Sequence, residues 1–372
     1  MKYLLSLVLI AFVFVGCSTK QNEVNIKMSN KNDKLVVHKN TNENIQNEVI
    51  EEIDLFDIIE HDEFISGDKP SIRIAFVFPS KIVGKYANSS INTILGYLAY
   101  KDVSYELKIF DSKTENIQNV QETFDDIKDK GFTKVIALFT PKISNTLNEL
   151  DVDDLDVYLP LVNKNEMNSL SSNFIFGSIS YNKQIQKLLE FSSNNNVMFY
   201  QESFIGHKLK SIYEELAPSI KLVKSIKSKR NRFKSIIKDK RLSDSTLFLN
   251  TTIVKTSIIL SQLNVYEIFP KVTLSTQLNY NPLLISLTQV NDRTNFIVAN
   301  SIEKVDDMLS DKISTYDGDI VYNWVDYSTL VGVNYLYDFN NENLIQTQII
   351  DNEVIYNPKL FISTSFGFLE IK

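Results

Sequence analysis

Residues 72–111 read IRIAFVFPSKIVGKYANSSINTILGYLAYKDVSYELKIFD, and their pattern decides the fold class. The run from Ile72 to Phe78 is apolar except for Arg73 and is closed by Pro79, which indicates a buried strand. Residues 88–100 carry apolar side chains at helical spacing, and residues 105–110 have the composition of a second strand. This order predicts a strand, a crossover helix and a second, parallel strand.

The same alternation continues for roughly 300 residues, the size of one large domain or two medium domains. Further strands are predicted at 134–139, 157–162, 174–179, 196–200, 220–226, 246–249, 271–276 and 296–300. Further helices are predicted at 117–130, 181–192, 204–216, 232–238, 253–263 and 322–337, and residues 344–371 are expected to form short strands or a hairpin. We therefore predict an α/β protein with two doubly wound parallel-sheet lobes. Lobe one is assigned residues 71–192 with part of 275–340, and lobe two residues 193–274 with the C-terminal segment.

The N-terminus has the pattern of a secretory signal peptide over residues 1–16. Lys2 precedes an apolar run from Leu4 to Val15, which is too short to span a bilayer. The sequence Phe-Val-Gly-Cys ending at Cys17 resembles the lipobox of bacterial lipoproteins. This resemblance implies cleavage before Cys17 and acylation of its thiol and amine, palmitate included. Ser18, in place of an aspartate, resembles an outer-membrane sorting signal, so we expect anchoring there, facing the periplasm.

Residues 17–70 are predicted to be a lipid anchor followed by a flexible tether, because the stretch from Ser18 to Glu52 is polar and lacks periodicity. Within it, residues 50–65 (IEEIDLFDIIEHDEFI) alternate acidic and apolar side chains. This pattern favours a short amphipathic helix that docks on the domain or on a partner.

Several motifs resemble type I periplasmic-binding proteins, and most closely the penicillin-binding protein activator lipoproteins. In residues 72–111 the shared features are Pro79, Gly84, Gly96, Ala99 and Asp111. The sequence VTLSTQL at 272–278 and the helix at 322–337 resemble later parts of that fold. The resemblance covers residues 71–372 and implies a non-enzymatic protein with a two-lobed fold. The activators' large N-terminal helical-repeat region has no counterpart here, and Ser80-Lys81 stands where that family has Ser-Gly.

Ligands of open parallel sheets bind at the carboxyl ends of strands, which points to four loops. The ligand-binding candidates in these loops are Ser80, Thr140, Ser144, Glu202, Ser275 and Thr276. In the loop beginning at Thr140, hydroxyls and a helix N-terminus could receive a carboxylate. Glu202 and Asp326 are candidates for a ligand's amine. The alternative is that Thr140 and Ser275, like Ser203, only cap helices or strand ends.

Residues 221–241 (KLVKSIKSKRNRFKSIIKDKR) hold ten basic side chains and one acidic side chain. One interpretation is a docking surface for an acidic partner, anionic lipid or glycan, with Lys229, Arg230, Arg232 and Lys234 as its contacts. The other is a solvated helix face that balances acidic segments elsewhere in the chain.

The composition of the chain argues against two classes of function. The net charge of −7 argues against a general nucleic-acid binder, and three histidines with one cysteine argue against a His/Cys metal site. No catalytic or phosphate-binding motif stands out, so we predict no enzyme activity and no cofactor. The first hypothesis is a regulator that binds an envelope protein such as a peptidoglycan synthase. The alternatives are a solute receptor of an ABC transporter, with a small-molecule ligand, and a structural component of an envelope machine.

Overall fold

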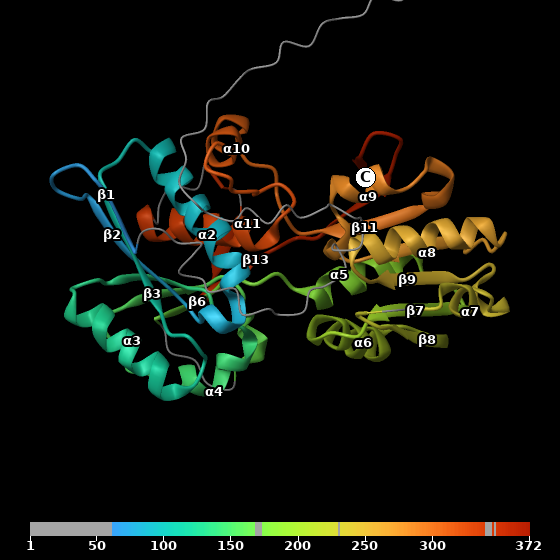
Figure 1. Ribbon diagram of the computed structural model, residues 1–372, viewed down its shortest axis with the longest axis horizontal. Helices are drawn as coiled ribbons and strands as arrows, with labels where there is room; N and C mark the ends of the chain where they lie inside the picture. The colour runs from blue at the N-terminus through green and yellow to red at the C-terminus, as the bar shows by residue number, and fades with distance from the viewer. Residues whose placement is uncertain (1–61, 168–172, 230, 339–343, 346) are drawn as a thin grey trace, which may run out of the picture. The chain divides into compact units, whose positions relative to one another are not determined.

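The computed structural model describes residues 62–167, 173–229, 231–338, 344–345 and 347–372. In this part of the chain two mainly parallel sheets are each covered by helices on both faces (Figure 1). The predicted fold class is confirmed. The signal peptide, Cys17 and most of the tether lie outside the described residues.

The first sheet has the order β1-β3-β2-β4-β5-β6-β13-β12. Its strands are β1 (Glu63–Ser66), β2 (Ile72–Phe78), β3 (Tyr105–Asp111), β4 (Lys134–Ala137), β5 (Asp156–Leu159), β6 (Phe174–Phe176), β12 (Gln348–Ile350) and β13 (Glu353–Ile355). Strands β2 to β6 run parallel, whereas β1 pairs antiparallel with β3, and β12 antiparallel with β13. Alternate side chains of β2 enter two separate cores: Ile74 and Phe76 one, Ala75 and Val77 the other.

Helices α2 (Ser80–Tyr100), α10 (Asp307–Ser314) and α11 (Trp324–Tyr337) cover one face of this sheet, and α3 (Ile117–Asp129) and α4 (Ser144–Leu147) cover the other (Figure 1). Helix α2 buries Ala87, Ile91, Ile94 and Leu98, an apolar stripe at helical spacing. At Gly96 a Cβ atom would lie 2.8 Å from the Cα of Ile313 in α10, so glycine permits the close packing of these two helices.

The second sheet has the order β15-β14-β11-β10-β9-β7-β8. Its strands are β7 (Asn196–Gln201), β8 (Ile220–Ile226), β9 (Thr246–Asn250), β10 (Val272–Ser275), β11 (Phe296–Asn300), β14 (Lys359–Ser363) and β15 (Phe368–Glu370). Strands β7 to β11 are parallel, and β14 and β15 add an antiparallel edge. Helices α5 (Tyr181–Leu188) and α6 (Phe204–Leu216) pack on one face, and α7 (Phe233–Ile237), α8 (Ile253–Val265) and α9 (Pro282–Leu287) on the other.

Some boundaries differ from the predictions. The predicted helix over 50–65 does not extend to its C-terminal end, because Glu63–Ser66 forms β1, paired with β3; residues 50–61 lie outside the described ranges. Residues 63–66 of the predicted tether therefore belong to the first sheet. Helix α5 packs mainly on α6 and β11 of the second sheet, although residues 181–192 were assigned to lobe one. The C-terminal segment is divided, since β12 and β13 join the first sheet and β14 and β15 the second.

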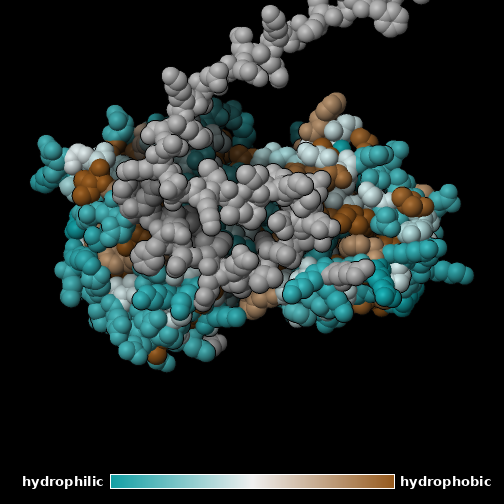
Figure 2. Space-filling model, viewed as in Figure 1, coloured by the Kyte–Doolittle hydropathy of each residue, from teal (hydrophilic) through white to brown (hydrophobic). Residues whose placement is uncertain are grey.

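The surface of these layers is mostly hydrophilic where Figure 2 is coloured. The short helices α4, α9 and α10 were not predicted, because four to eight residues are too few to establish a helical period. Helix α10, for example, buries only Leu309 and Ile313. Among the described residues, no helix is both long enough and apolar enough to cross a membrane.

Candidate functional site

The six ligand-binding candidates lie where the sequence predicts, next to the carboxyl ends of parallel strands. Ser80 follows β2, and Thr140 and Ser144 follow β4 in the first sheet. Glu202 follows β7 in the second sheet, where Ser275 ends β10 and Thr276 comes next. Each sheet thus gathers three of the candidates at the carboxyl ends of its parallel strands, where ligands of such sheets bind.

Thr140 already holds a carboxylate, which comes from the chain itself. Its backbone N–H donates to Oε1 of Glu115 at 2.5 Å, and its hydroxyl donates to Oε2 at 2.7 Å. Burial raises the pKa of Glu115, and the hydrogen bonds from Thr140 oppose that rise. The carboxylate at this loop is therefore an internal side chain, and contact of Thr140 with a ligand stays a prediction.

The other two candidates of the first sheet are also engaged by the fold. The backbone N–H of Ser80 donates to Oδ1 of Asp111 at 3.0 Å, and Lys113 N–H donates to the same oxygen at 2.7 Å. The backbone N–H of Ser144 donates to the carbonyl of Pro141. These contacts fix the loops after β2, β3 and β4 in place.

In the second sheet, Asn250 lies beside Ser275 and Thr276 and is hydrogen-bonded to both. Its Oδ1 accepts from the backbone N–H of Thr276 at 3.0 Å and from the Thr276 hydroxyl at 3.1 Å. Ser275 donates to the Leu249 carbonyl at 2.8 Å and accepts from Asn279 at 2.8 Å. Both candidates are fully buried, so they serve the packing of this edge.

Glu202 is exposed and accepts a hydrogen bond from the Ser225 hydroxyl at 2.7 Å. A buried amide cluster lies at the same edge of the sheet and was missed by sequence reasoning. Gln184 of α5 donates to Gln277 Oε1 at 2.9 Å and to the Ser301 hydroxyl at 2.7 Å. Gln184 lies 93 and 117 residues away from these two partners in the sequence. Neither spacing nor composition could have indicated that they meet.

Asp326, a second candidate for a ligand amine, is buried in the first turn of α11. Its Oδ2 accepts from the Ser89 hydroxyl and from Asp319 N–H, the latter at 2.9 Å. Its Oδ1 has no hydrogen-bond partner among the described residues. Burial raises the pKa of Asp326 to about 6. The carboxyl is therefore part of the packing between α2 and α11.

Two contacts connect residues near the first sheet with α6 of the second. Lys208 forms an ion pair with Glu166, and both side chains are partly buried. Lys142 Nζ lies 5.4 Å from the ring centroid of Phe204. Glu166 follows β5 and Lys142 follows β4, so helix α6 supplies internal partners to the loops after these two strands.

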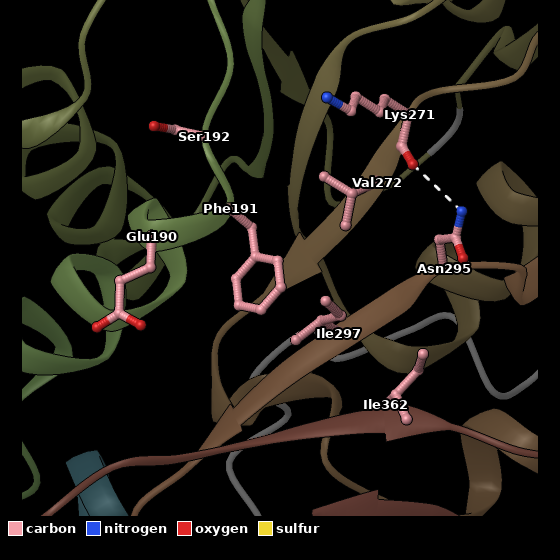
Figure 3. Close-up of a pocket in the computed structure, with 8 residues that line it drawn as sticks. All are labelled: Glu190, Phe191, Ser192, Lys271, Val272, Asn295, Ile297 and Ile362. Carbon is pink, nitrogen blue, oxygen red and sulfur yellow. Dashed lines mark hydrogen bonds between the residues drawn. The ribbon is translucent and has the colours of Figure 1, made fainter. Parts of the chain in front are cut away.

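Two cavities lie away from the candidate loops. One, of about 410 Å³, opens at the amino ends of β10 and β11 (Figure 3). It is lined by Glu190, Phe191, Ser192, Lys271, Val272, Asn295, Ile297 and Ile362. Asn295 Nδ2 closes part of its edge by donating to the Lys271 carbonyl at 3.3 Å. The second cavity, of about 810 Å³, lies beside α7 in the basic segment.

The basic segment is exposed at three of its four predicted contacts, Lys229, Arg232 and Lys234. Arg230 lies outside the described residues. Helix α7 buries Ile237 and half-buries Phe233 and Ile236 against the second sheet, as the apolar spacing predicts. In the described part of the chain, no group of three or more His, Cys, Asp or Glu side chains is placed to hold a metal ion.

Comparison with known proteins supports the fold. No protein-family profile and no curated protein sequence matches the chain. Among solved structures, the LpoA C-domain of Haemophilus influenzae, a regulator of PBP1A, is similar with a TM-score of 0.53 and 10% identity, covering 81% of this chain and 100% of that one. The Streptococcus pneumoniae branched-chain amino acid binding protein LivJ, solved with isoleucine, has a TM-score of 0.55 and 9% identity, covering 81% and 99%. A substrate-binding protein of an ABC transporter from Sphaerobacter thermophilus has a TM-score of 0.59 and 10% identity, covering 81% and 96%. These similarities confirm the fold of type I periplasmic-binding proteins.

Proposed function

We propose that the chain is a non-enzymatic lipoprotein that binds and regulates another protein of the bacterial cell envelope, such as a peptidoglycan synthase. One observation carries this proposal: the Glu115 carboxylate occupies both donors of Thr140, the place where a ligand carboxylate was predicted. The same fold in a regulator of PBP1A supports the proposal, because it serves protein regulation there.

The other candidate loops strengthen the argument against a solute receptor. A receptor presents convergent polar groups to its ligand and recovers their hydrogen bonds on binding. Here Asn250 satisfies Thr276, and Ser225 donates to Glu202. A solute at these loops would have to displace intact internal hydrogen bonds, and each buried group left without a partner costs about 1–3 kcal/mol.

A solute receptor is the second candidate function. It is favoured by the similarity to an amino acid binding protein solved with isoleucine. For that function, Glu115 would have to leave Thr140 when a ligand carboxylate binds. Since both groups are partly buried, this exchange requires a movement of the loop after β3.

The anchor gives the regulator its location in this proposal. Acylated Cys17 would hold the chain in the outer membrane, facing the periplasm, and the polar segment that follows would let the domain search for a partner at a distance. Fully extended, the polar stretch from Ser18 to Glu52, some 35 residues, would reach on the order of 100 Å, although a coil spans much less.

The proposal can be tested with purified peptidoglycan synthases of the source organism. We expect the mature chain to change the rate of glycan polymerisation or crosslinking by at least one synthase severalfold, at micromolar concentration. A heat-denatured sample is the control for nonspecific effects. Unchanged rates for every synthase, together with saturable heat on titration with an amino acid, would favour the receptor instead.

A further inference from the structure

A groove between α7 and α8 combines positive charge with an apolar floor. Its lining residues are Arg232, Phe233, Lys234, Ser235, Lys238, Ile258 and Gln262, and its volume is about 810 Å³. Arg232, Lys234 and Lys238 are exposed, whereas Phe233 and Ile258 are half-buried. We call this feature the α7–α8 groove. Its lining contains three cations and no acidic side chain.

In the part of the chain that the structure describes, the cations of the groove take no part in ion pairs. The one acid of the segment, Asp239, pairs with Lys224 at 3.0 Å and with Arg241 at 2.8 Å. These contacts hold the pKa of Asp239 well below its usual range. Within the described ranges, no acidic side chain forms an ion pair with the three groove cations. Lys238 Nζ lies 4.9 Å from the ring centroid of Tyr266, a contact that leaves its positive charge without an acidic partner.

The chain around the groove is held in a defined position. The buried Lys255 ammonium of α8 donates to the Lys227 carbonyl at 2.7 Å and to the Ser228 carbonyl at 2.8 Å. Asn231 closes the next turn by hydrogen bonds with both the N–H and the carbonyl of Lys227, each at 2.9 Å. A binding surface gains affinity from such order, because less conformational entropy is lost when it binds.

We propose that the α7–α8 groove binds an acidic segment of the partner protein, one that carries an apolar side-chain row. This inference rests on the proposed function and names the surface by which the partner is held. Carboxylates would pair with Arg232, Lys234 and Lys238, and apolar side chains would cover Phe233 and Ile258. An anionic membrane would match the cations as well, and it is the competing outcome of the test below. The three cations around Phe233 and Ile258 favour a polypeptide segment that carries carboxylates beside apolar side chains.

A direct test uses a fluorescent 14-residue peptide with leucines at helical i, i+3, i+4 and i+7 spacing and glutamates between them. Added to the full mature chain at low salt, it should bind with micromolar affinity. Reversal of the groove charges by R232E, K234E and K238E together should weaken binding at least tenfold. Neutralisation by R232Q, K234Q and K238Q should weaken it less, because repulsion is absent. Replacing the peptide's leucines with serines should also cost at least tenfold.

Matched controls separate groove binding from bulk charge. K69E, K183E and K359E together change the net charge equally, at exposed lysines outside the groove, and should weaken the peptide less than threefold. The proposal is overturned if the peptide does not bind, or if both triple variants weaken it alike. It is also overturned if phosphatidylglycerol vesicles bind through the same three residues and the serine peptide equals the leucine peptide. If the groove variant still alters synthase rates, the regulator proposal stands and this surface is wrong.

Discussion

Replacing Glu115 with alanine should lower the free energy of unfolding by about 2–3 kcal/mol, and acetate should restore part of that loss. The substitution leaves the N–H and the hydroxyl of Thr140 without the carboxylate that now accepts from both. Hydrogen bonds to a charged acceptor contribute about 1.5–3 kcal/mol, and an unsatisfied buried donor has a similar cost. Urea unfolding with and without 100 mM acetate measures both effects.

Acetate should rescue Glu115→Ala because its carboxylate fits the two vacated donors. If its dissociation constant is on the order of 10 mM, 100 mM acetate adds about 1.4 kcal/mol of stability. The native chain should show no such gain, and neither should Glu115→Ala combined with Thr140→Val. Glu122→Ala, a change at an exposed acid seven residues further along, should alter stability by less than about 0.5 kcal/mol. Equal effects at the two positions, or no specific rescue by acetate, would show that Glu115 does not fill a carboxylate site.

Asp326 should make the chain less stable as the pH rises from 4 to 7. Its pKa is about 6 in the folded protein, against about 3.9 in an unfolded chain. The folded state therefore binds the extra proton between these values, and stability falls as the pH rises through that window. A difference of two pKa units corresponds to about 3 kcal/mol at neutral pH.

Asp326→Asn removes this titration while keeping one oxygen for the hydrogen bonds from Ser89 and Asp319. Relative to the native chain, the variant should gain about 2–2.5 kcal/mol of unfolding free energy between pH 4 and pH 7.5. Its absolute stability at low pH should be somewhat reduced, because the amide NH₂ replaces an oxygen that has no partner in the described part of the chain. Urea unfolding across this pH range gives the difference, and exposed Asp311→Asn is the control. A difference that does not change with pH would contradict the assignment.

The pattern of the chain was sufficient to predict the layered fold. Strand β2 and helix α2 follow from apolar runs and helical spacing, although α2 begins at Ser80, eight residues before the predicted start. Residues 80–87 hold two lysines, a serine and Gly84, so apolar side chains at helical spacing are sparse before residue 88. The edge strand β1 was hidden for another reason: it is short and mostly exposed, and its pairing with β3 comes from backbone hydrogen bonds that composition does not record.

The sequence predicted where the candidate residues lie, but not that other side chains of the chain would hydrogen-bond to them. Parallel topology alone places Thr140 and Thr276 at strand ends, and the structure has them there. That Glu115 and Asn250 would satisfy them depends on loops 25 and 26 residues away meeting at atomic distance, which no local pattern encodes. Asp326 shows the same limit, since its burial depends on helix α2 packing over it. The lipid anchor at Cys17 stays a prediction.

We propose that the domain binds a protein partner and no solute, because Glu115 and Asn250 already satisfy the donors of Thr140 and Thr276 at its strand ends. Native mass spectrometry tests this most directly, on the mature chain extracted in mild detergent from its own cells. We predict a species containing a second polypeptide, and a free chain whose mass equals that of the acylated protein alone. A free chain that carries a stoichiometric adduct of amino acid size, released on unfolding, with no polypeptide partner, would contradict the account.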